Sequence, residues 1–104
     1  MMVSELTHAA QAVAPGHEPR FYDDRGCLAQ DVASLPADAR LFVQLDSGAG
    51  WIDVRDAFFA LPTHLRTPMG YGVTAFRNQQ DAARADGSGR ALRWSDVVAE
   101  LRKR

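Results

Sequence analysis

The sequence predicts a small α+β domain, with short strands in a mixed or antiparallel sheet and short helices beside them. Short apolar segments of strand length alternate along the chain with segments whose apolar residues recur at helical spacing. Turn residues separate them, as in the Pro- and Gly-rich segment Ala14–Pro19. The chain has 104 residues, enough for one modest core. We therefore expect a single domain over residues 1–104.

Composition narrows the classes of function. A hydrophobic content of 46% is ordinary for an ordered domain. A net charge of −1 does not indicate binding to nucleic acid or to an anionic membrane. The single cysteine excludes an internal disulfide. No apolar run approaches the ~20 residues of a membrane span. The N-terminal residues Met1–Glu5 have neither the basic nor the apolar region of a signal peptide.

The first third of the chain predicts a hairpin followed by a helix. His8–Val13 and Arg20–Tyr22 have the composition of two strands joined by the turn. Asp23-Asp24 offers an N-cap, and the helix should stop at Ser34-Leu35-Pro36. Cys27 then falls in the first helical turn, where N–H groups and the helix dipole favour a thiolate. The alternative is a small buried residue that packs the helix on the sheet.

The middle of the chain predicts further strands. Leu41–Leu45 is apolar almost throughout, which indicates a central strand. Trp51–Leu61 is ambiguous in its periodicity, with a bend expected over Asp53–Asp56 and a strand over Phe58–Leu61. We expect a core that contains Trp51, Phe58, Phe42, Phe76, Val43 and Leu92.

The last third predicts two strands and two helices. Gly72–Phe76 should form a strand, and Asn78 can cap a short helix over residues 79–86. Arg90–Trp94 should return as a strand. Ser95 is then the expected cap of a final amphipathic helix, whose apolar residues share one face.

One loop stands apart from these elements. Thr67–Gly72 places Met69 between a proline, which fixes its own φ, and two glycines, which permit conformations closed to other residues. Met69 therefore lies outside any apolar stripe. Its thioether either packs into the hydrophobic core or serves as a soft ligand for a metal ion.

Taken in order, these motifs resemble the NosL family. The resemblance covers essentially the whole chain and is carried by Phe21–Leu28 (F-Y-D-D-R-G-C-L), Trp51–Phe58 (W-I-D-V-R-D-A-F), Thr67–Gly70 (T-P-M-G), Val73–Phe76 (V-T-A-F) and Gly87–Asp96. NosL proteins are copper-binding accessory proteins of nitrous oxide reductase, usually exported and often lipid-anchored. Their fold is similar to that of an organomercurial lyase domain.

The resemblance implies a function for this chain. It implies a Cu(I)-binding, metallochaperone-like protein that is not an enzyme and that delivers copper to nitrous oxide reductase or its maturation machinery, in the periplasm or outside the membrane. Soft thiolate and thioether donors suit Cu(I). The implied ligands are Cys27, Met69 and Met1, with His64 as a weak auxiliary ligand.

The sequence also departs from the family pattern. NosL members carry a C-x-x-C-x-M motif before the first strand, and Met1 aligns with its methionine, so both cysteines would lie upstream of residue 1. We therefore expect a chain that is truncated at its N-terminus relative to the family. The alternatives are a metal-free interaction domain or a relic without copper delivery, and then an enzyme like the organomercurial lyase, which needs more cysteine than this chain has.

Overall fold

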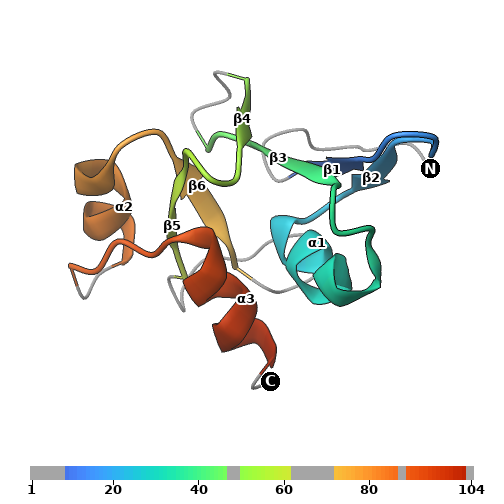
Figure 1. Cartoon of the computed structure of the whole chain (residues 1–104). Helices are drawn as coiled ribbons and strands as arrows, with labels where there is room; N and C mark the ends of the chain where they lie inside the picture. The colour runs from blue at the N-terminus through green and yellow to red at the C-terminus, as the bar shows by residue number, and fades with distance from the viewer. Residues whose placement is uncertain (1–8, 47–49, 62–71, 87–88, 103–104) are drawn as a thin grey trace.

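The computed structural model describes residues 9–46, 50–61, 72–86 and 89–102. Within them the main sheet has four antiparallel strands in the order β2-β1-β3-β4: β1 (Ala10–Val13), β2 (Arg20–Tyr22), β3 (Arg40–Gln44) and β4 (Trp51–Asp53). The predicted hairpin is confirmed as β1 and β2, and the predicted central strand is β3, which pairs on both sides (Figure 1).

A second, two-stranded antiparallel sheet consists of β5 (Phe58–Ala60) and β6 (Thr74–Phe76). The strand predicted over Arg90–Trp94 is wrong. That segment contributes only an isolated bridge, in which Leu92 exchanges two backbone hydrogen bonds with Phe59. The bridge places Leu92 against the edge of β5 that β6 leaves open.

Short helices complete the α+β fold: α1 (Arg25–Asp31), which continues into the 3-10 turn η2 (Val32–Ser34), α2 (Gln79–Asp86) and α3 (Trp94–Arg102). The predicted N-caps of α1 and α2 are confirmed, because the Asp24 side chain accepts from the Gly26 amide and the Asn78 side chain accepts from the Asp81 amide. The cap predicted at Ser95 is wrong, since α3 already includes that residue and Asp96 accepts from the Arg93 amide instead.

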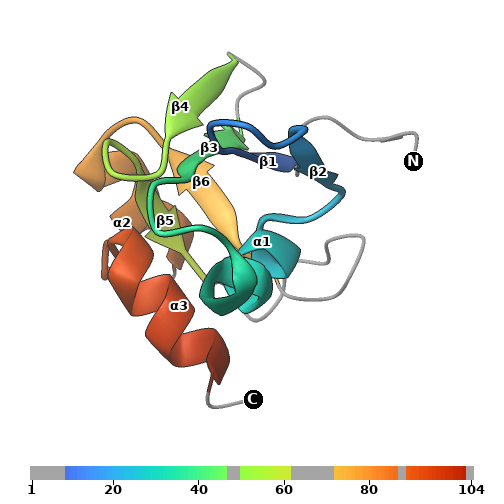
Figure 2. The same cartoon turned by 45° about the vertical axis from the view of Figure 1, so that its right-hand side comes forward.

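The helices cover different parts of the strands. Helix α1 contacts β1 and β2, α2 contacts β5 and β6, and α3 contacts both α1 and β5. Figure 2 shows α1 and α3 side by side, with α2 at the other end of the molecule from β2. No helix within the described ranges is both long and apolar enough to cross a membrane.

The core is made of smaller residues than we predicted. Val43 is fully buried as expected, but the Trp51 side chain is 38% exposed, and Phe42, Phe58, Phe76 and Leu92 are only half-buried. Neighbouring residues of a strand face opposite sides of the sheet. In β3, β4 and β6 the smaller neighbour points inward, whereas in β5 the buried residue is Phe59. The core consists largely of Ala10, Leu28, Val43, Ile52, Phe59, Val73, Ala75, Val97 and Leu101.

Candidate functional site

Of the four predicted metal ligands, one lies in the described structure. Cys27 is half-buried in the first turn of α1, as predicted, and its amide donates to the Asp24 carbonyl at 3.0 Å. Met69, Met1 and His64 lie outside the described residues. The predicted approach of the Met69 sulfur to within ~10 Å of the Cys27 sulfur therefore stays a prediction.

The Cys27 thiol is protonated at neutral pH. Burial, together with the nearby charges of Asp24 and Asp23, raises the pKa of the thiol to about 11. The expectation that the start of a helix favours a thiolate is therefore wrong here. Desolvation and two carboxylates in the preceding residues outweigh the helix dipole, because both disfavour a second negative charge at the sulfur.

The two aspartates before the helix differ in their surroundings. Asp24 is fully buried, and one of its oxygens accepts from the Gly26 amide at 2.8 Å. Asp23 Oδ1 is buried but accepts no hydrogen bond from the residues that the structure describes. The two carboxylates just before α1 therefore lie close to the cysteine. Their negative charges disfavour a thiolate but favour a bound cation.

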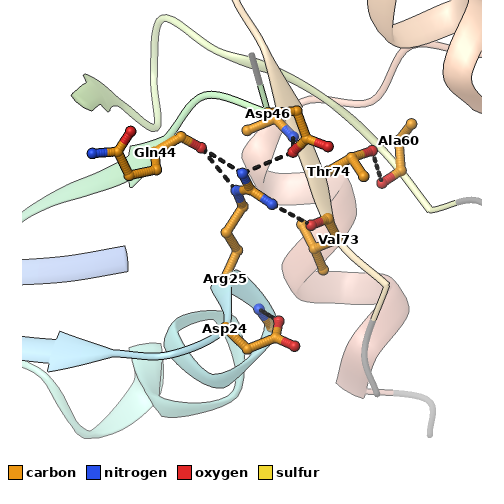
Figure 3. Close-up of polar contacts among 9 residues, drawn as sticks. Asp24, Arg25, Gln44, Asp46, Ala60, Val73 and Thr74 are labelled. Atoms are coloured by element: carbon orange, nitrogen blue, oxygen red, sulfur yellow. Dashed lines mark hydrogen bonds and ion pairs between the residues drawn. The ribbon is translucent and has the colours of Figure 1, made fainter. Parts of the chain in front are cut away.

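Arg25 lies two residues before Cys27, and its side chain is completely buried. Its Nε and Nη2 atoms donate to the Gln44 carbonyl at 2.9 and 2.7 Å, and Nη1 donates to the Val73 carbonyl at 2.8 Å (Figure 3). Nη2 also forms an ion pair with Asp46 at 2.7 Å. One guanidinium thus ties the start of α1 to the end of β3 and to the residue before β6.

Asp46 joins the two sheets at the same point. Its amide donates to the Ala75 carbonyl at 2.9 Å, and its Oδ1 accepts from the Ala75 amide at 3.1 Å. The side chain of Asp46 therefore takes the role that a backbone carbonyl has in a strand pair. Because the same Oδ1 contacts Arg25, we call Arg25, Asp46 and the carbonyls of Gln44 and Val73 the Arg25 junction.

The sequence did not reveal the Arg25 junction. Arg25 stands in a polar run between a helix cap and a glycine, where a charged side chain is usually solvated. Burial of an arginine depends on carbonyls that come from distant segments, here 19 and 48 residues away in sequence. No local pattern encodes such partners.

Within the described ranges, no three His, Cys, Asp or Glu side chains are grouped closely enough to hold a metal ion. No family model matches the chain, and neither the curated proteins nor the solved structures contain a match. What the structure itself establishes is a half-buried thiol beside two aspartates, on a helix turn fastened by a buried arginine.

Proposed function

We propose that this protein binds one Cu(I) ion as cargo through Cys27 and Met69 and passes it to a partner protein. The NosL resemblance carried by the five motifs supplies the identity of the metal, and it makes nitrous oxide reductase or its maturation machinery the proposed receiver. It also supports a location in the periplasm or on the outer side of the membrane. Met1 and His64 are the proposed auxiliary ligands.

The observation that carries the proposal is the hydrogen bond from Arg25 Nη1 to the Val73 carbonyl, at 2.8 Å. It fixes a point of the chain four residues after Met69 against the helix turn that bears Cys27. Four residues span at most ~14 Å when fully extended. This short connection supports a shared site for Met69 and Cys27, although the two residues are 42 positions apart in the sequence.

The chemistry around Cys27 suits a soft cation. Cu(I) prefers thiolate and thioether donors and accepts low coordination numbers. The Asp23 and Asp24 charges, which oppose loss of the thiol proton, favour a positive ion at the sulfur. Cys27 is only half-buried, so a partner's ligand can approach it. Two protein donors leave room for that ligand to bind before Cys27 releases its cargo.

The proposal is tested by titrating the protein with Cu(I) under reducing conditions, in competition with a chromophoric Cu(I) chelator. We expect one ion per chain. Met69→Leu removes the sulfur at nearly constant volume and should weaken binding about tenfold, or ~1.4 kcal/mol. The control is Met2→Leu, which removes a thioether that the NosL pattern does not use and should leave affinity unchanged. A wild-type chain that binds no Cu(I) would instead support the metal-free interaction domain.

Copper binding should strengthen with pH. The pKa of Cys27 is about 11, so each bound ion displaces one thiol proton throughout the neutral range. The apparent affinity should then rise roughly tenfold per pH unit between about pH 6 and 8. The same chelator competition at three pH values measures the slope. A flat profile would mean that the sulfur is already deprotonated or is not a ligand.

A further inference from the structure

We propose that Arg25 is a positioning residue for the Cys27 sulfur, and that its ion pair with Asp46 sets the geometry in which Cys27 meets its cargo. The inference rests on the proposed function only for the identity of that cargo. Arg25 itself does not approach the ion, because its guanidinium points away from solvent into the junction of the two sheets (Figure 3).

The placement of the arginine is otherwise hard to account for. A fully buried cation near the N-terminus of a helix is opposed both by desolvation and by the positive end of the helix dipole. The contacts that offset this cost come from two separate regions, the Gln44 and Asp46 end of β3 and the Val73 carbonyl. Together these contacts hold the chain two residues before Cys27 against both regions.

The rest of α1 is fastened differently. At its other end, Gln30 Nε2 donates to the Leu101 carbonyl and Tyr22 donates to Asp31 at 2.6 Å, both in partly buried positions. These contacts hold the helix on α3 and β2, but they lie a helical turn away from Cys27. Loosening the Arg25 junction should therefore free the cysteine, whereas loosening the Gln30 contact should free only the end of the helix.

The test compares Asp46→Asn with Gln30→Ala. Asn keeps the oxygen that accepts from the Ala75 amide and removes the charge that faces Arg25. Three properties are measured: the alkylation rate of Cys27 in the metal-free protein, the ultraviolet absorption of the copper thiolate, and the affinity for Cu(I). We expect Asp46→Asn to speed alkylation at least fivefold, to change the absorption band and to weaken affinity about tenfold. Gln30→Ala should change none of these by more than twofold.

Equal effects of the two variants would mean that Arg25 stabilises the fold without positioning Cys27. Unchanged values in Asp46→Asn would overturn the proposal. Arg25→Met removes the guanidinium altogether and should reproduce the effects of Asp46→Asn. If Arg25→Met does not fold, the comparison of Asp46→Asn with Gln30→Ala decides alone. If the wild type binds no Cu(I), the proposed function fails, while the alkylation rates still decide whether the junction positions Cys27.

Discussion

Cys27→Ser is expected to weaken Cu(I) binding at least a hundredfold, or about 2.8 kcal/mol. Serine has nearly the same shape as cysteine, but its hydroxyl is a hard, neutral donor that Cu(I) does not prefer. The remaining thioethers are uncharged and hold the ion weakly. Chelator competition under reducing conditions gives the affinity, and loss of the copper thiolate absorption identifies the missing ligand.

The substitution should leave the fold intact, because Cys27 is half-buried and the backbone bond from its amide to Asp24 does not involve the sulfur. Far-ultraviolet circular dichroism and the unfolding midpoint check this. Ser34→Ala is a matched control, since it alters a small side chain just beyond the same helix. Copper binding that survives Cys27→Ser unchanged would rule out the proposed site.

Phe59→Ala should lower the free energy of unfolding by about 3–5 kcal/mol, which is the usual range for removing a buried aromatic side chain. Phe59 is fully buried at the centre of β5 and lies against the Trp94 ring, with a centroid distance of 5.4 Å. It also holds together β6, the Leu92 bridge and the start of α3. Since small domains are stable by only about 5–15 kcal/mol, the variant should be close to unfolding at room temperature.

The neighbouring residue provides the control. Phe58 is half-buried on the opposite face of β5, beneath the Arg93 guanidinium at 4.4 Å from the ring centroid. Phe58→Ala deletes the same atoms and should cost clearly less, about 1–2 kcal/mol, since its side chain is only partly buried in the folded protein. Urea unfolding of both variants measures the difference. Equal losses would mean that the two faces of β5 are buried alike.

Local signals in the sequence were sufficient for much of the fold. The caps at Asp24 and Asn78 depend on residues two or three positions away, and the composition of β3 marks it as central. Cys27 could be placed in the first turn of α1 for the same reason. In each case the physical cause lies within one turn or one strand.

What the sequence could not supply depends on the partners of each residue. Aromatic residues at Trp51 and Phe42 suggested a core, but strand register turned them to the outer face and left Val43 inside. The raised pKa of Cys27 follows first from burial of its sulfur, which depends on the packed fold and which no local spacing predicts. The Arg25 junction depends on carbonyls that only the assembled sheets bring together.

The long separation between Arg25 and its partners has a kinetic consequence. Its contacts with Gln44 and Val73 close loops of 19 and 48 residues, so the chain loses considerable entropy before they can form. The guanidinium can leave water only when both sheets are in place, so these contacts should be absent from the transition state for folding. Interactions that form late slow unfolding rather than speed folding. The Arg25 junction should therefore act as a latch that prolongs the lifetime of the folded state, without affecting how quickly that state is reached.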